Sequence, residues 1–159
     1  RQPRSTLFPY TTLFRSDGLK DTWNFERIYV NPPYGLDRKR GTGIKNWLYR
    51  CAHAHKEYGS EILALVPVAT NTGHWKKYVF GKAKVVCFLY DTRLKFLVNG
   101  KDGGKGAPMS CAMIYWGENY ERFQSIFRTF GAVVCLDELK KPEAAAFRDE
   151  LQMELVSEL

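Results

Sequence analysis

The stretch from Glu26 to Gly35, ERIYVNPPYG, places an amide, two prolines and an aromatic ring directly after an apolar, β-branched run. Proline has no backbone N–H and holds the residue before it extended, so a strand is predicted to end at Asn31. The backbone there is stiff and turns outward. It presents the amide of Asn31, the carbonyl group of Pro32 and the ring of Tyr34. Such a set can grip a flat group that carries an NH2.

The exocyclic amine of adenine is one such group, and it is a poor nucleophile because its lone pair is delocalised into the ring. Two acceptors that hydrogen-bond its N–H groups localise that pair and aim it. The Asn31 side-chain oxygen and the Pro32 carbonyl are the predicted acceptors, and Tyr34 is predicted to stack on a base flipped out of the duplex. The predicted catalytic residues are Asn31, Pro32, Pro33 and Tyr34. A strand-terminating turn without chemistry is the alternative.

The sequence around this turn resembles the adenine-N6 DNA methyltransferases, and in particular their phage-encoded Dam-like branch. NPPYG is the amino-group signature of those enzymes, and further matches precede and follow it in the same order as in the family. These matches are Gly18, Leu19, Trp23, Leu65, Val66, Pro67, Thr70, Thr72, Trp75, Arg93, Leu94, Lys95, Phe96, Ala107, Pro108 and Ser110. The resemblance covers roughly Asp17 to Gly117.

This resemblance implies an enzyme that transfers a methyl group from S-adenosylmethionine to the N6 amino group of adenine in double-stranded DNA. It further implies a cytoplasmic location in a bacterial host or phage-infected cell, and a monomer is expected. Two other functions remain open. One is a non-catalytic nucleic-acid-binding fragment. The other is a methyltransferase of protein glutamine amides, which also uses an NPPY motif for a planar NH2 group but needs a long upstream cofactor domain.

The first sixteen residues, RQPRSTLFPYTTLFRS, have no helical or strand period and contain a near repeat. The string TLFPYTTLFRS resembles a translated sequencing adapter, so residues 1–16 are interpreted as non-native. A native arm and a cloning scar are the alternatives. Family members place their cofactor-binding residues upstream of NPPY, where this chain has only that segment. The resemblance therefore implies a truncated fragment whose cofactor-binding residues are unassigned and which binds S-adenosylmethionine weakly or not at all.

Positive charge is unevenly distributed along the chain. The net charge is +7 and the pI about 9.3, but seven acidic residues accompany three basic ones from Asp137 onward. Residues 1–136 thus carry an excess that favours a polyanionic partner. The predicted DNA-contacting residues lie in the loop after the catalytic turn and in the glycine-rich stretch NGKDGGKGAP. They are Arg38, Lys39, Arg40, Lys45, Lys101 and Lys105. A solvated basic surface is the alternative.

The cysteines and histidines are predicted to have structural roles. Each of the four cysteines lies in an apolar segment without CxxC spacing, which indicates small core residues in a reducing compartment. The three histidines lack a metal-binding spacing, so no metal is expected, and His55 falls on the apolar face of a predicted helix. No apolar run approaches the roughly 18 residues of a membrane span, so no membrane association is expected.

The elements around the turn alternate between strands and helices. Strands are expected at RIYVN, EILALVPV, AKVVCFLY and GAVVCLDE, and helices over Gly43 to Tyr58, Asn71 or Thr72 to Phe80, and Tyr120 to Phe130. The runs TRLKFLV and SCAMIYWG are expected to flank a glycine-rich hairpin or long loop. The predicted fold class is α/β, a three-layer sandwich with a mixed sheet and a partial Rossmann-like S-adenosylmethionine-dependent methyltransferase fold. Residues 17–136 would form the catalytic domain, and residues 137–159 an acidic tail with an amphipathic helix from Pro142 to Leu159.

Overall fold

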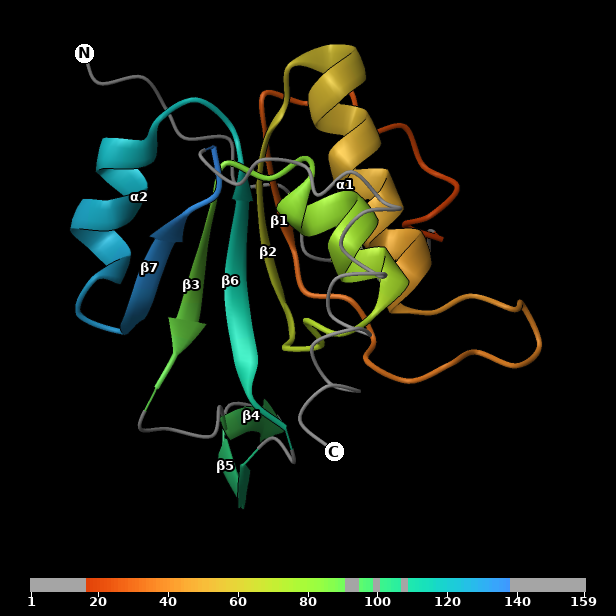
Figure 1. The fold of residues 1–159 in the computed structure, drawn as a ribbon. Helices are drawn as coiled ribbons and strands as arrows, with labels where there is room; N and C mark the ends of the chain where they lie inside the picture. Colours follow the sequence, from red (N-terminus) through yellow and green to blue (C-terminus); the bar gives the residue numbers. More distant parts are fainter. Residues whose placement is uncertain (1–16, 91–94, 99–100, 107–108, 138–159) are drawn as a thin grey trace, which may run out of the picture.

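The computed structural model describes residues 17–90, 95–98, 101–106 and 109–137 (Figure 1). For residues 95–98 and 101–106 it describes the backbone, and for the other ranges it describes the side chains as well. The sequence of elements alternates between strands and helices, except for four successive strands before the second α-helix. The elements are β1 (Arg27–Val30), α1 (Ile44–Tyr58), β2 (Glu61–Pro67), the π-helix η1 (Trp75–Phe80), β3 (Val85–Leu89), β4 (Lys95–Val98), β5 (Lys101–Gly106), β6 (Cys111–Trp116), α2 (Tyr120–Phe127) and β7 (Gly131–Cys135).

Five of these strands form one open, mixed sheet in the order β1-β2-β6-β3-β7. β1 and β2 are parallel and are connected through α1, whereas β6 is antiparallel to both of its neighbours and β7 is antiparallel to β3. β4 and β5 pair with each other in a separate antiparallel ribbon. The predicted α/β class with a mixed sheet is therefore confirmed.

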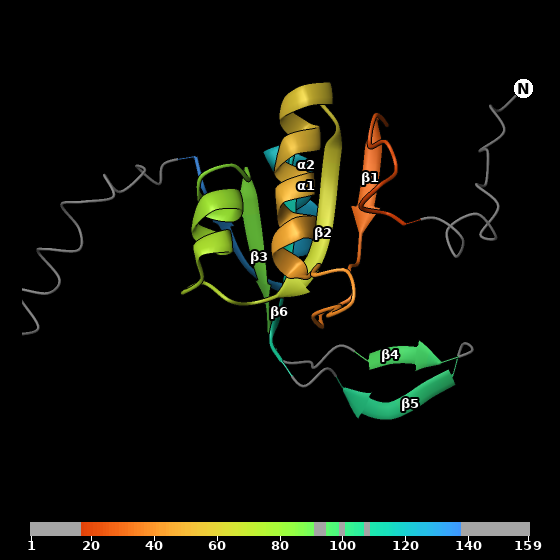
Figure 2. The ribbon, with the colours of Figure 1, turned by 90° about the vertical axis from the view of Figure 1, so that its right-hand side faces the viewer.

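Helices pack on both faces of the five-stranded sheet. α1 and η1 lie on one face and α2 on the other (Figure 2). Successive side chains of β2 point to opposite faces of the sheet, and both faces are covered. Ile62 and Ala64 belong to the core cluster with α1, whereas Leu63 between them packs against the cluster with α2. A strand covered on both sides needs apolar residues at every position, which explains the continuous run EILALVP. The Rossmann-like character of this arrangement stays a prediction.

The larger core cluster is built around two tryptophans. Trp75 of η1 and Trp116 of β6 are both fully buried, and the Trp116 indole N–H donates to the carbonyl oxygen of Tyr78 at 3.2 Å. A buried indole needs such a partner, so this bond ties the central strand β6 to η1. The cysteines support this picture of the core, since Cys51, Cys87 and Cys111 are buried and Cys135 is half-buried, and all four are free thiols.

The ends of α1 follow from local chemistry. The Asn46 side chain accepts a hydrogen bond from the backbone N–H of Gly43 at 3.0 Å, which satisfies a donor at the helix start. At the other end Gly59 has φ of 69°, a left-handed conformation that costs glycine nothing, and its N–H donates to the His55 carbonyl at 2.9 Å. The helix predicted from Gly43 to Tyr58 is confirmed to within one residue.

Two sequence-based assignments were wrong in detail. TRLKFLV and SCAMIYWG do not face each other across a loop, because β4 pairs with β5, which is formed by the glycine-rich stretch itself, and β6 enters the main sheet. Glycine is a poor strand former, so this pairing depends on the partner strand rather than on β5 alone. α2 also ends at Phe127, and Phe130 is 58% exposed in the turn that follows.

Some predicted features cannot be compared with the structure. Residues 1–16 and the predicted helix from Pro142 to Leu159 lie outside the described residues. Within the part of the chain that is described, no helix is both long and apolar enough to span a lipid bilayer.

Candidate active site

The Asn-Pro-Pro-Tyr turn begins directly where β1 ends. Asn31 follows Val30, the last residue of the strand, and this confirms the prediction that Asn31 lies at the C-terminal end of a strand in a helix-covered sheet. The ends of β1 and β2, the loop after the turn and the β4–β5 ribbon all lie at the same end of the molecule (Figure 2). In open α/β sheets, ligands bind at this edge.

The turn buries one proline and exposes its amide. Pro32 is buried, whereas Asn31 and Pro33 are exposed. Among the residues that the structure describes, none hydrogen-bonds the Asn31 side chain, so its carboxamide oxygen is available to accept from a ligand. The buried Pro32 anchors the backbone from which that amide projects. The turn therefore presents a fixed backbone and an available acceptor side by side.

Tyr34 is held from behind by the central strands. Its half-buried ring packs against Leu65 of β2 and Cys111 of β6, and its hydroxyl donates to the Leu65 carbonyl oxygen at 3.5 Å. The thiol of Cys111 lies 3.9 Å from that hydroxyl. Burial, followed by the proximity of Cys111, raises the pKa of Tyr34, so the phenol stays neutral at physiological pH. These contacts hold the ring in place as a neutral aromatic surface beside the turn.

A cavity of about 430 Å³ opens on the outer side of β1, next to Asn31. It lies between β1, the segment of residues 17–25 and the start of α1, and both aromatic and charged side chains line it. The lining residues are Asp17, Gly18, Asp21, Thr22, Trp23, Phe25, Ile28, Tyr29, Val30, Asn31, Arg40 and Trp47. Its volume is within the range of roughly 300–1,000 Å³ that is usual for small-molecule sites.

Gly18 and Trp23 shape the wall of this cavity. The Trp23 indole N–H donates to the Gly18 carbonyl oxygen at 2.7 Å, and the Trp23 ring lies 6.3 Å from that of Trp47. A Cβ at Gly18 would meet the Trp47 ring at 2.9 Å, so only glycine lets the segment approach α1 this closely. Gly18 and Trp23, two of the family matches that precede NPPYG, thus hold the segment of residues 17–25 beside the Asn-Pro-Pro-Tyr turn.

The basic loop after the turn is closed on itself. Asp37 and Thr42 exchange backbone hydrogen bonds of 2.8 and 3.2 Å, and the Asp37 carboxylate accepts from the N–H groups of Lys39 and Arg40. Gly41 has φ of 63° at the loop tip, a conformation that favours glycine. The loop is therefore a small, internally bonded hairpin.

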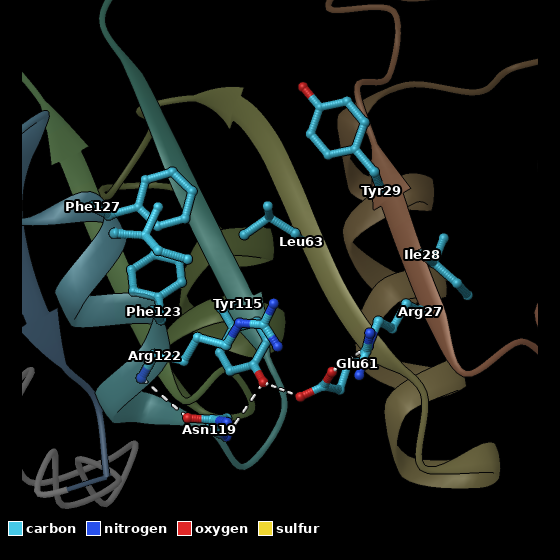
Figure 3. Close-up of a pocket in the computed structure, with 11 residues that line it drawn as sticks. Arg27, Ile28, Tyr29, Glu61, Leu63, Tyr115, Asn119, Arg122, Phe123 and Phe127 are labelled. Atoms are coloured by element: carbon cyan, nitrogen blue, oxygen red, sulfur yellow. Dashed lines mark hydrogen bonds and ion pairs between the residues drawn. The ribbon is translucent and has the colours of Figure 1, made fainter. Parts of the chain in front are cut away.

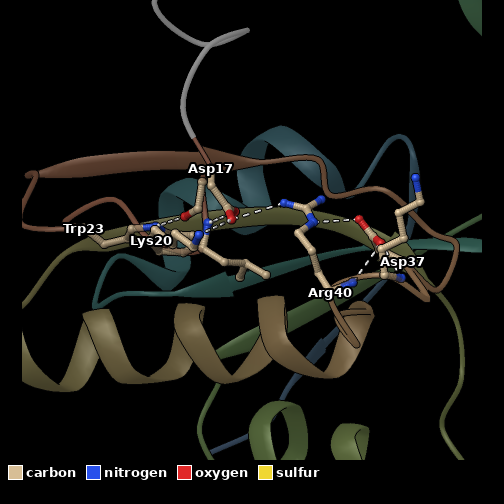
Figure 4. A network of polar contacts seen from close by, with 8 residues as sticks. Asp17, Lys20, Trp23, Asp37 and Arg40 are labelled. Carbon is tan, nitrogen blue, oxygen red and sulfur yellow. Dashed lines mark hydrogen bonds and ion pairs between the residues drawn. The ribbon is translucent and has the colours of Figure 1, made fainter.

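Arg40 connects this loop to the wall of the cavity (Figure 4). Its Nε lies 2.6 Å from Oδ2 of Asp37 and its Nη1 lies 3.2 Å from Oδ2 of Asp17. Sequence reasoning assigned Arg40 to DNA alone and missed this bridge. The Asp-x-x-Arg spacing is a usable signal for the contact with Asp37, because an aspartate often bonds to residues two and three positions on. Nothing local pointed to Asp17.

The six predicted DNA-contacting residues fall on three neighbouring elements. Arg38, Lys39 and Arg40 are exposed in the loop of residues 37–42, and Lys45 is exposed in the first turn of α1. Lys101 and Lys105 lie on β5, for which only the backbone is described. All three elements lie at the end of the sheet where Asn31 is found (Figure 2). The structure thus brings the residues to one end of the molecule, and their contact with DNA stays a prediction.

The histidines and cysteines form no metal centre in the described ranges, where no group of three or more potential ligands gathers. The Nδ1 atom of His55 lies 2.9 Å from the Ser60 carbonyl oxygen, which confirms the structural role that was predicted for this side chain. Burial, and then the charge of Lys45, lower the pKa of His74.

Comparison with known proteins bears directly on this site. The family model for the DNA N-6-adenine-methyltransferase (Dam) matches residues 8–144. This match extends past Gly117, where the resemblance seen in the sequence ended, and it begins within the segment of residues 1–16. Neither the curated proteins nor the solved structures gave a significant match. The matched range includes β1, the Asn-Pro-Pro-Tyr turn, the loop after it and the whole five-stranded sheet. The chain therefore belongs to the DNA N-6-adenine-methyltransferase (Dam) family.

Proposed function

We propose that the turn at Asn31 acts in methyl transfer from S-adenosylmethionine to the N6 amino group of adenine in double-stranded DNA. The observation that carries this proposal is the exposed Asn31 amide at the end of β1, next to the buried Pro32 and beside a cavity with aromatic walls, in a chain of this family. Each of these features answers one requirement of the reaction.

The first requirement is to make the amine nucleophilic. The Asn31 side-chain oxygen accepts from one N–H of the base and the Pro32 carbonyl accepts from the other, so the nitrogen lone pair leaves conjugation with the ring. Because Pro32 is buried and its ring fixes the backbone, its carbonyl group needs little reorganisation when charge develops on the nitrogen. The Tyr34 ring, whose hydroxyl is bound at β2, replaces part of the stacking that the base loses when it leaves the duplex.

The second requirement is a place for the methyl donor. S-adenosylmethionine, when bound, supplies an electrophilic methyl group. The residues around the cavity fit such a molecule, since Tyr29 and Trp47 offer aromatic surface. The Asp21 carboxylate has no side-chain partner in the described part of the chain, whereas that of Asp17 is bound to Arg40. Asp21 is thus the carboxylate available to the hydroxyl or ammonium groups of a nucleoside ligand.

Asn31 lies between these two regions. The cavity is on the outer side of β1, whereas the Tyr34 ring packs toward β2 and β6. A donor in the cavity and a base against Tyr34 would therefore approach the Asn31 amide from opposite sides. This placement supports the assignment of the base to the Tyr34 side.

The third requirement is binding of the DNA around the target base. The loop of residues 37–42, Lys45 and the β4–β5 ribbon lie at the end of the sheet that carries Asn31. Their positive side chains can neutralise phosphates next to the flipped base, and a two-stranded ribbon has the width to enter a major groove.

The decisive experiment is transfer of tritiated methyl groups from S-adenosylmethionine by the purified chain, and label would correct the sequence-based expectation that this chain binds the donor weakly or not at all. We expect label in duplex DNA that contains adenine, in N6-methyladenine after digestion, and no label in DNA without adenine. Label in a glutamine-containing peptide but not in DNA would favour an amide methyltransferase. Salt-dependent DNA binding with no label in any substrate would favour a non-catalytic binding role, and either result would overturn the proposal.

A further inference from the structure

A second groove lies on the opposite face of the sheet from α1. α2 covers β3, β6 and β7 on that face and leaves β1 and β2 open beside it (Figure 3). The groove has a volume of about 380 Å³. Tyr29 of β1 forms one wall, Phe127 and Ile126 of α2 form the other, and Leu63 lies between them on β2. None of these residues belongs to the proposed active site, apart from Tyr29 at the edge of β1.

The groove is apolar and has the width of one helix. Tyr29 is 60% exposed and Ile126 is 47% exposed, so apolar surface faces water from both walls. Strands are spaced about 4.8 Å apart and a helix is about 10 Å wide, so β1 and β2 leave room for one helix beside α2. An open apolar face of this kind is usual for an interaction site.

The polar end of the groove carries an arginine that forms no ion pair with the described residues. Nε of Arg27 lies 3.1 Å from Oε2 of Glu61, and the other carboxylate oxygen accepts from the Tyr115 hydroxyl at 2.6 Å. Arg122, on the opposite wall, has no carboxylate within ion-pair distance among the described residues. Arg27 also pairs with Glu26 at 3.3 Å, so Arg122 is the guanidinium group that has no carboxylate partner here, and an acidic partner complements it.

The last residues of the chain match this groove in pattern and charge. From Pro142 onward the sequence places an apolar residue at every fourth position, Phe147, Leu151, Leu155 and Leu159, which is the spacing of one helical face. Acidic residues, among them Glu150 and Glu154, flank that stripe. The family match ends at residue 144, so most of this segment is a feature of this chain beyond the matched family region.

The described part of the chain ends within reach of the groove. Asp137 forms an ion pair with Lys84, which directly precedes β3. From β3 to β2, which carries Leu63, the sheet has two strand spacings, about 10 Å, and residues 138–141 span about 13 Å when extended. The groove walls α2 and β1 are about 12 and 13 Å long, so they would contact about two turns of a helix over residues 142–159, which would be about 27 Å long.

We propose that the acidic segment of residues 142–159 binds as a helix in the groove between α2 and β1, with its stripe of every fourth apolar residue facing Leu63. The acidic flank then lies near Arg122 and Arg27. The groove shares Ile28 and Tyr29 with the cavity on the outer side of β1, but α2, Leu63 and the segment of residues 142–159 have no role in the methyltransferase proposal, so the two proposals can fail separately.

Hydrogen exchange of the full chain tests the proposal from the segment's side. Amides of residues 143–159 should exchange at least tenfold more slowly than those of an unfolded peptide with that sequence. The double substitution Leu151→Asp and Leu155→Asp should abolish this protection and speed exchange in α2. The matched control, Ala146→Asp with Met153→Asp, adds the same charge on the opposite helical face and should leave the protection intact.

A substitution in the groove tests it from the other side. Ile126 is already half-exposed, so Ile126→Asp is expected to leave the fold intact. This substitution should nevertheless remove the protection of the amides of residues 143–159 from hydrogen exchange, although these residues are far from it in the sequence. Val134→Asp, on exposed apolar surface of β7, is the control and should have no effect. Unprotected segment amides in the wild-type chain, or protection unchanged by Ile126→Asp, would overturn the proposal. So would a dimer that Ile126→Asp converts to a monomer in light scattering, because a second copy would then fill the groove.

Discussion

The guanidinium group of Arg40 lies 3.2 Å from the carboxylate of Asp17, across the mouth of the cavity beside Asn31. The same guanidinium group is bound to Asp37 within its own loop. Arg40 thus joins the loop after the Asn-Pro-Pro-Tyr turn to the segment that precedes β1. A residue that sequence reasoning assigned to DNA is already engaged in positioning two parts of the candidate site.

This arrangement predicts a pH dependence of the loop. The side-chain hydrogen bond from Arg40, assisted by backbone N–H groups, holds the pKa of Asp37 below its ordinary value of 3.8. The contact should therefore be fully formed above that pH and should break as the pH falls through the lowered pKa of the folded loop. Amide exchange at Lys39 and Arg40 should accelerate at those low pH values. Asp37→Asn should remove the transition, and a transition that persists in this variant would contradict the assignment.

Asn31→Ala removes one oriented acceptor from the proposed site. We expect the rate of adenine methylation to fall about 10²-fold or more, by comparison with the removal of a single oriented hydrogen bond to a transition state. The unfolding temperature should change little, because the side chain is exposed. Asn24→Ala, at an exposed asparagine that does not line the cavity, is the control. Near-normal methylation by Asn31→Ala would exclude Asn31 as the acceptor.

Tyr34 should act through its ring rather than its hydroxyl. Tyr34→Ala should weaken capture of a flipped base by about 1–3 kcal/mol, the usual contribution of one stacking side chain. Tyr34→Phe keeps the ring and removes the hydroxyl, with its long bond to the Leu65 carbonyl and its contact with the Cys111 thiol, so its base capture should stay close to that of the wild type. The fluorescence of 2-aminopurine at the target position reports the flipped base. Equally weakened capture in both variants would show that the hydroxyl is the important group.

Arg38 and Lys39 should contribute to DNA affinity in a salt-dependent way. Both are exposed in the loop that follows the Asn-Pro-Pro-Tyr turn. Replacing both with alanine should weaken DNA binding and reduce the salt slope of log K by about 1 for each phosphate that is no longer neutralised. Lys56→Ala, in the last turn of α1 and so at the other end of that helix from Lys45, should leave the slope unchanged. Identical slopes for all three proteins would place the DNA elsewhere.

Gly131 should tolerate no side chain. A Cβ there would lie 2.2 Å from the Phe88 carbonyl oxygen, which belongs to the backbone of the paired strand β3 and cannot move aside cheaply. Gly131→Ala should destabilise the protein by about 1–3 kcal/mol in urea unfolding, as overpacking does. Gly73→Ala, where a Cβ would have no neighbour within 4 Å, is the control and should cost little. A neutral Gly131→Ala would show that β7 is less tightly paired.

The features that sequence alone predicted are those that local chemistry determines. β1 ends at Val30 because the residues after Asn31 are prolines without N–H donors, and no distant contact is needed for this. α1 ends before Gly59 because a left-handed residue closes the helix there. The strands of the main sheet and the family resemblance were likewise visible as patterns of neighbouring residues, and the family match confirms the latter.

The tertiary structure decided which distant residues meet. Tyr34 contacts Cys111, 77 positions away, and Arg40 reaches Asp17, because the sheet order and the path of the loop bring them together. The pairing of β4 with β5 was also decided by the tertiary structure. A glycine-rich segment has a low intrinsic propensity to form a strand, so β5 depends on its contact with β4. The cavity beside Asn31 and the groove beside α2 exist only where separate elements pack. Contacts of this kind are set by packing between elements, and spacing along the chain does not encode them.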